Sequence, residues 1–95
     1  MKKIKIKVVG PEEDYTSYTC YLWLLEIGDF IEEDFNVTVE VEWEKSVEAI
    51  SSFDYFPVLL IEGRKVFVGL PSEAGFLYEI IRSFLIREMK FKPVS

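Results

Sequence analysis

Residues 56–69 decide the fold of this 95-residue chain and read Phe56-Pro57-Val58-Leu59-Leu60-Ile61-Glu62-Gly63-Arg64-Lys65-Val66-Phe67-Val68-Gly69. The run 58–61 is apolar at every position, which is typical of a strand buried on both faces. The run 62–65 predicts a tight turn, and 66–68 predicts the strand that returns beside the first. We therefore expect an antiparallel β-hairpin in the second half of the chain.

Two earlier segments, 3–9 and 36–44, alternate between apolar and polar residues, as strands with one buried face do. A helix expected at about 17–33 joins them, so they should be parallel neighbours with a right-handed crossover. Their charged faces then coincide and form an exposed ion-pair network, an interpretation that we favour over a partner-docking surface. The residues that face one another are Lys3, Lys5 and Lys7 on the first strand and Thr38, Glu40, Glu42 and Glu44 on the second.

The helix expected at about 17–33 can be capped by Asp14, Thr16 or Ser17. Gly28 lies inside it and marks a kink or an early end, because an interior glycine costs about 1 kcal/mol relative to alanine. Helical spacing assigns its apolar stripe to Tyr18, Tyr21, Leu22, Leu25, Phe30 and Ile31.

Two further helices are expected after the second strand. A short helix of one or two turns begins after Ser46, which can cap it. The last helix runs from an N-cap at Ser72 to about residue 89, and 90–95 should form a loose tail. Its wide apolar stripe consists of Phe76, Leu77, Ile80, Ile81, Phe84 and Leu85.

The composition excludes several classes of function. The chain has one cysteine, Cys20, and no histidine, so neither an internal disulfide nor a histidine-based catalytic or metal site can form. No spacing matches a known metal loop or a phosphate-binding loop, and we expect neither a metal nor a cofactor. The net charge of -6 disfavours nucleic acid and anionic membranes as partners.

The compartment and source are also predicted from composition. A lone cysteine favours a reducing compartment, and the N-terminus lacks the apolar core of a signal peptide, so we expect a cytoplasmic protein. The absence of glutamine and the single asparagine, Asn36, are typical of a thermophile protein.

The order of elements and the stretch 56–69 resemble the small thioredoxin- and glutaredoxin-like proteins. In that family a cis-proline opens the third strand and glycines turn the hairpin and follow the fourth, where Pro57, Gly63 and Gly69 stand here. The resemblance covers nearly the whole chain in topology but only 57–69 in residue detail. It implies one thioredoxin-like α/β domain over 1–95, with β-α-β-α-β-β-α order and a four-stranded mixed sheet. The implied strand order is second, first, third, fourth, with the first and last helices on one face.

The family's redox motif, two cysteines separated by two residues, belongs between the first strand and the first helix. That place reads Ser17-Tyr18-Thr19-Cys20 here, so only the second thiol is present. An internal disulfide cycle is therefore excluded for the isolated chain.

Three roles remain for Cys20. It attacks a disulfide if it is exposed at the helix start, it forms a mixed disulfide with a small thiol or a partner protein, or it is an inert core residue. The resemblance favours a thiol-redox protein, a monothiol disulfide oxidoreductase, acting through Cys20 on a protein thiol or disulfide or a small thiol. Ser17 then marks the motif position, and the binding surface consists of Phe56, Pro57, Tyr18 and Thr19. The alternative is a redox-inactive thioredoxin-fold binding module, with a homodimer among its forms.

Overall fold

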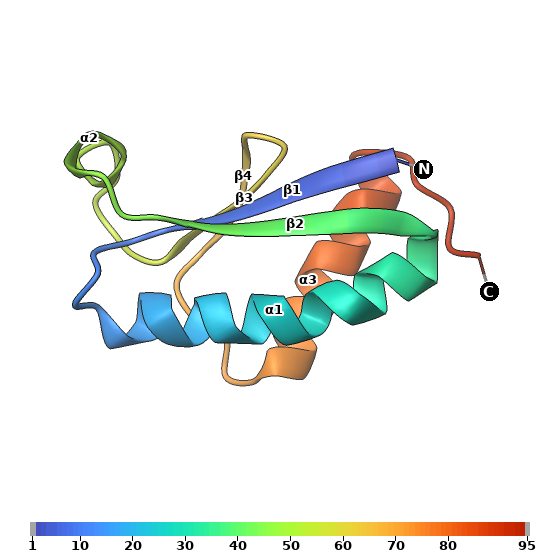
Figure 1. Ribbon diagram of the computed structural model, residues 1–95, viewed down its shortest axis with the longest axis horizontal. Coiled ribbons are helices and arrows are strands. Elements are labelled where there is room, and N and C mark those ends of the chain that lie inside the picture. Colours follow the sequence, from blue (N-terminus) through green and yellow to red (C-terminus); the bar gives the residue numbers. More distant parts are fainter. Residues whose placement is uncertain (1, 95) are drawn as a thin grey trace.

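The computed structural model describes residues 2–94 as a sheet with two long helices on one side and a short helix on the other (Figure 1). Along the chain the elements are β1 (Lys2–Val9), α1 (Tyr15–Phe35), β2 (Val37–Glu44), α2 (Val47–Ile50), β3 (Val58–Ile61), β4 (Arg64–Val68) and α3 (Ala74–Arg87). None of these helices is both long enough and apolar enough to span a membrane.

The sheet is mixed and four-stranded, as expected, in the order β2-β1-β3-β4. Strand β1 pairs in parallel with β2, so that Ile6 lies opposite Val41, and antiparallel with β3, so that Ile6 also lies opposite Ile61. Strand β4 then pairs antiparallel with β3. Because β1 is paired on both sides, alternate residues along it are fixed to opposite faces of the sheet.

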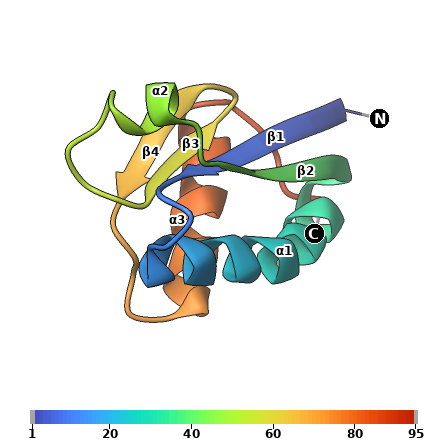
Figure 2. The ribbon, with the colours of Figure 1, turned by 60° about the vertical axis from the view of Figure 1, so that its left-hand side comes forward.

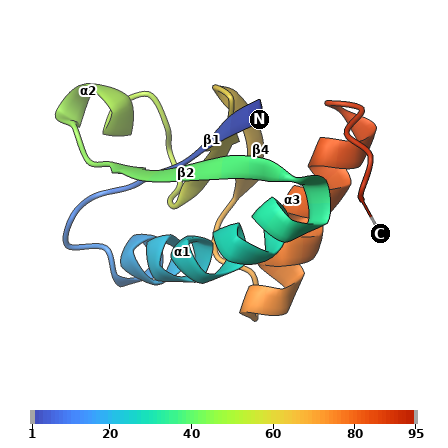
Figure 3. The ribbon, with the colours of Figure 1, turned by 45° about the vertical axis from the view of Figure 1, so that its right-hand side comes forward.

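The core lies between the sheet and the two long helices, α1 and α3, which cover the same face (Figures 2 and 3). The alternating apolar residues of β1 supply its centre, and every one of them is buried because its face is covered along the whole strand. The fully buried residues include Ile4, Ile6 and Val8 from β1, Leu24 and Ile31 from α1, and Leu77, Ile81 and Leu85 from α3.

The opposite face carries the predicted ion pairs between β1 and β2. Helix α2 lies over one end of this face only (Figure 1), so the charged side chains remain in contact with water. Exposed pairs of this kind contribute roughly 0–1 kcal/mol each. The pairs are Lys3–Glu40 at 2.7 Å, Lys5–Glu42 at 3.2 Å, and Lys7 with Glu42 and Glu44 at 3.7 Å each.

Strand β3 departs from the expectation of burial on both faces. Val58 is buried on the open face, but Leu60, which lies opposite Lys7, is only half-buried. The loop after α2 lies beside Val58, because Phe53 and Tyr55 line a hollow together with it. Leu60 instead lines a hollow together with Lys5 and Lys7.

Helix α1 differs from the prediction in its ends and in the face that it buries. It begins at Tyr15 and continues through Gly28 to Phe35, so the glycine neither kinks nor ends it. A Cβ on Gly28 would lie 3.5 Å from a methyl carbon of Val39, so the helix passes close over β2 there. Burial along this sheet contact outweighs the small cost of one interior glycine.

The apolar stripe assigned to α1 was wrong for most of its members. Tyr18, Leu22, Leu25 and Phe30 are exposed, and only Ile31 of the assigned stripe is buried. Helix α1 is apolar on two sides, and spacing alone does not say which side meets the sheet. The buried residues of α1 are Ser17, Cys20, Leu24, Ile27, Gly28, Ile31 and Phe35.

The start of α3 and the tail after it also differ from expectation. Glu73 occupies the N-cap position without a side-chain hydrogen bond, which leaves Ser72 one residue too early to cap the helix. The tail is held against the body, because the Phe91 amide donates to the Leu85 carbonyl at 2.9 Å and the Val94 amide donates to the Asp34 carbonyl at 2.7 Å. Residue 95, also assigned to the loose tail, lies outside the described residues.

Candidate functional site

The end of β1, the start of α1 and the segment before β3 come together at one end of the molecule (Figure 2). Ser17, Cys20 and Pro57, which the resemblance to thioredoxin-like proteins implies as the motif positions and the cis-proline, lie at this end. The arrangement follows from the topology, since a parallel β1-α1-β2 unit brings the helix start close to the end of its preceding strand.

Gly10, the first residue after β1, lies directly against the first turn of α1. A Cβ on Gly10 would lie 1.9 Å from the Ser17 Oγ and 2.7 Å from the Ser17 Cβ, so no other residue fits without a shift. Ser17 has no exposed surface. Ser17, at the position that the resemblance assigns to an attacking cysteine, is therefore covered by the loop backbone.

Asp14 caps α1 and also holds Ser17. Its carboxylate accepts hydrogen bonds from the Ser17 amide at 3.2 Å, from the Ser17 hydroxyl, and from the Thr16 hydroxyl at 2.9 Å. Partial burial acts to raise the pKa of Asp14, but the hydrogen bonds from Ser17 and Thr16 outweigh it and hold the pKa below its ordinary value. Of the three predicted capping residues, Asp14 is the one that caps, while Thr16 and Ser17 lie within the helix.

Cys20 lies one turn further along α1 and faces the core. It is 1% exposed and belongs to the same apolar cluster as Ile6 and Leu24. Burial raises the pKa of the Cys20 thiol to about 12, so the thiol is protonated at physiological pH. The first of the three roles requires an exposed Cys20, and this exposure is not found in the structure.

The Phe56–Pro57 peptide bond is cis, as the resemblance implies. Pro57 is buried, and its carbonyl accepts a hydrogen bond from the Gly69 amide at 2.7 Å. Phe56 is half-buried, and its Cβ lies 3.7 Å from where a Cβ on Gly10 would be. Phe56 and Ser17 therefore both lie close to Gly10.

Tyr18 and Thr19 lie toward the outside of the first turns of α1. Tyr18 is 46% exposed, and its ring packs at a tilt against Trp43 of β2, with ring centroids 6.0 Å apart. The Trp43 indole donates to the Gly10 carbonyl at 3.1 Å. Thr19 is half-buried.

Sequence reasoning missed two residues that shape this end, Gly10 and Trp43. Gly10 directly follows the strand expected at 3–9, and Trp43 is one of the apolar positions of the strand expected at 36–44, so neither was among the predicted site residues. The signal that could have found Gly10 is its place directly after a strand and seven residues before the motif serine, where a crossover brings backbone close to the helix.

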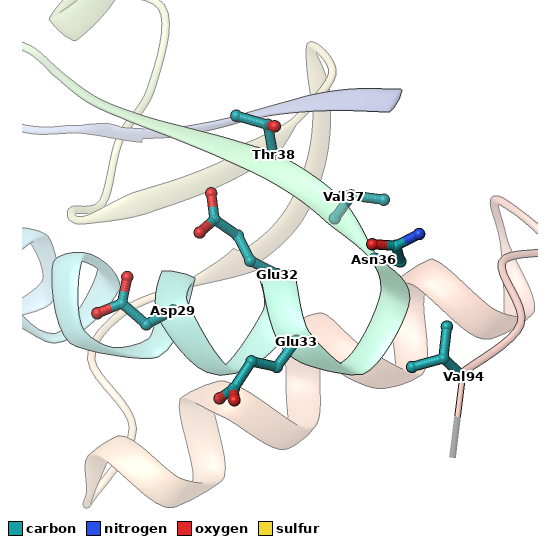
Figure 4. A pocket seen from close by; sticks show the side chains of 7 residues that line it. All are labelled: Asp29, Glu32, Glu33, Asn36, Val37, Thr38 and Val94. Carbon is teal, nitrogen blue, oxygen red and sulfur yellow. The ribbon is translucent and has the colours of Figure 1, made fainter. Parts of the chain in front are cut away.

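A separate hollow of about 740 Å³ lies at the other end of α1 (Figure 4). Asp29, Glu32 and Glu33 line it, but the carboxylates of Asp29 and Glu33 point in different directions, and Glu32 accepts a hydrogen bond from the Val39 amide at 2.8 Å. Within residues 2–94, no group of three or more candidate ligand side chains is arranged to hold a metal ion.

No protein-family model matches this chain, and a search of curated proteins found no significant match. The function is therefore inferred from the geometry of the chain. At the motif end, that geometry offers a covered serine, a buried neutral thiol and exposed aromatic rings. These groups suit contact with another molecule better than nucleophilic attack.

We expect Gly10→Ala to destabilise the protein by about 1–3 kcal/mol, because the new methyl group overlaps Ser17. Adding Ser17→Gly removes both clashing atoms, so the double variant should lose less than the sum of the two single losses. Urea unfolding of the four proteins measures this coupling. Gly75→Ala, whose methyl group would meet only the Glu73 carboxylate at 3.7 Å, is the control, and equal stability of Gly10→Ala and wild type would contradict the packing.

Asp14→Ala should cost about 1 kcal/mol at neutral pH through loss of the helix cap. Because the pKa of Asp14 is lowered in the folded state, its contribution is present above the unfolded value of about 3.9 and is lost as the pH falls through the folded value. Urea unfolding between neutral and acidic pH should therefore show the variant and wild type converging below about pH 3.9. Asp54→Ala removes an exposed carboxylate outside the helices as a control, and a gap for Asp14→Ala that stays constant with pH would count against the cap.

Proposed function

We propose that this chain is a redox-inactive, thioredoxin-like module that binds another protein without a covalent step. This proposal has two parts, a thioredoxin-like fold and a role in non-covalent binding. The fold rests on the sheet and on residues 57–69, and the role rests on the chemistry left at the motif end.

The sheet order and the hairpin support the thioredoxin-like assignment. Strand order β2-β1-β3-β4, with only β1 and β2 parallel, is the order that the resemblance implies. Pro57 directly precedes β3, Gly63 has φ of 80° in the hairpin turn, and Gly69 has φ of 99° after β4. Both φ values lie in the region that favours glycine, which accounts for the two glycines of the pattern.

The observation that carries the proposed role is the burial of both motif positions. A thiol exchanges with a disulfide through its thiolate, and the attacking sulfur must reach the target sulfur. Cys20 meets neither condition, because it is 1% exposed and its pKa is raised to about 12. Ser17 is covered by Gly10 and has no thiol.

Exposed apolar side chains near the motif end support a binding role. Tyr15 at the start of α1 is 76% exposed, and Tyr55, two residues before Pro57, is 74% exposed. Tyrosine combines a large apolar ring with a polar tip and is enriched at protein interfaces. Several such residues on one small domain favour a binding role over a purely structural one.

Thiol labelling tests the redox-inactive assignment. Iodoacetamide at pH 8 should leave Cys20 unmodified in the native protein and modify it fully in denaturant, since burial both hides the sulfur and keeps it protonated. Intact-protein mass spectrometry reads the result.

The matched control places an exposed thiol on the same helix. Tyr18→Cys in a Cys20→Ala background should react in the native protein, because residue 18 is exposed. Full labelling of native wild type, or reduction of insulin disulfides by it, would overturn the proposal in favour of a redox protein acting through Cys20.

A further inference from the structure

Helix α1 presents a second, exposed apolar face beside the one that it buries in the core. Tyr15, Tyr18, Leu22 and Leu25 follow one another at spacings of three and four residues, so they share one face of the helix. All four are exposed, Leu22 by 43% and Leu25 by 47%. Leu24 and Ile31 of α1 face the core instead. Tyr18, at the edge of the exposed face, packs against Trp43 of β2 with ring centroids 6.0 Å apart.

Acidic residues flank this face at both ends. Glu26 and Asp29 continue the same spacing beyond Leu25 and are exposed, while Glu12 and Glu13 lie exposed in the loop before α1. Helix α1 carries five acidic residues and no basic one, and the chain has no Lys or Arg between Lys7 and Lys45. The lysines that offset the acidic residues of β2 lie on the opposite face of the sheet.

A hollow of about 350 Å³ lies between α1 and the start of α3, on a side of α1 that none of the four face residues lines. Its lining is mostly apolar and includes Ile27, Phe30 and Tyr78, with Glu26 at its edge. Its volume suits one bulky apolar side chain of a partner, the kind of buried anchor that dominates binding energy in many interfaces.

The acidic residues at the two ends of this face indicate which class of molecule can bind to it. A second copy of this chain would bring two acidic faces together, and anionic lipid or nucleic acid would meet the same repulsion. A positively charged partner is attracted instead, and an exposed helix face is matched by the apolar stripe of another helix.

We propose that the face formed by Tyr15, Tyr18, Leu22 and Leu25 docks a basic amphipathic helix of a partner protein. Lysines or arginines at the two ends of that helix meet Glu12 and Glu13 at one end of the face and Glu26 and Asp29 at the other. The inference rests on the proposed function, since it takes non-covalent binding as the role of the domain.

A synthetic peptide of leucine and lysine, with leucines at i, i+3, i+4 and i+7 spacing, is the probe. Fluorescence anisotropy of the labelled peptide measures affinity, and amide chemical shifts of the protein locate the site. We expect shifts concentrated in α1 and affinity that falls as salt is added, because screening weakens the charge contacts. A peptide with glutamate in place of lysine should not bind.

Two variants that each add one positive charge distinguish binding at this face from general electrostatic attraction of the peptide. Leu22→Lys should weaken binding by about tenfold or more, because it removes a central apolar contact and adds a repelling charge. Val47→Lys, at a valine on α2 that is 82% exposed and lies outside this face, should change the affinity by less than about twofold. Because both side chains are exposed, both variants should unfold at wild-type urea concentrations, which circular dichroism checks.

Several outcomes would overturn the inference. These are equal affinities of the Leu22→Lys and Val47→Lys variants, shifts confined to β1 and β2, binding of the glutamate peptide, or sedimentation of the protein as a dimer that Leu22→Lys dissociates. Thiol labelling of the same native sample separates the two proposals. Labelling of Cys20 by iodoacetamide would count against the proposed function, whereas an unlabelled Cys20 without peptide binding would overturn only this inference.

Discussion

The close approach of Gly10 to Ser17 is the constraint on which the rest of this end of the molecule depends. With no room for a Cβ between them, the backbone after β1 lies directly on the first turn of α1. In the rotation of α1 about its axis that makes this contact, Ser17 is covered and Cys20, three residues later, points into the core. The same rotation turns Tyr18, Leu22 and Leu25 to the outside. The buried thiol and the exposed apolar face are thus two results of one orientation of α1.

The charges of the protein are divided between two surfaces with different physical character. On the open face of the sheet, glutamates of β2 lie beside lysines of β1, and exposed pairs of this kind add little stability. On α1 the acidic residues have no basic residue on the same helix. Residues 11–35, which comprise α1 and most of the loop before it, carry eight acidic residues and no basic one, so this segment can select a partner by its charge.

Strict alternation was enough to predict β1 and β2 and the pairing of their charged faces, because a period of two is specific to strands. The hairpin was predicted from an apolar run followed by a glycine turn. The assigned face of α1 was wrong because the helix is apolar on two sides, and the choice between them depends on contacts with residues far away in sequence. The burial of Ser17 could not be predicted for the same reason, since it depends on Gly10 and Phe56, which lie on separate segments. The local signals around Cys20 were compatible with either an exposed or a buried thiol.

Cys20 is part of the core, and we expect it to become accessible only when the whole domain unfolds. The most direct test is the rate of Cys20 labelling by a thiol reagent in the native protein across a series of low urea concentrations. We predict that the free energy of opening obtained from these rates equals the free energy of unfolding. We also predict that it falls with urea concentration at the same slope as global unfolding. Labelling that is fast and independent of urea would show that the start of α1 opens locally, and it would contradict the prediction that Cys20 becomes accessible only on global unfolding.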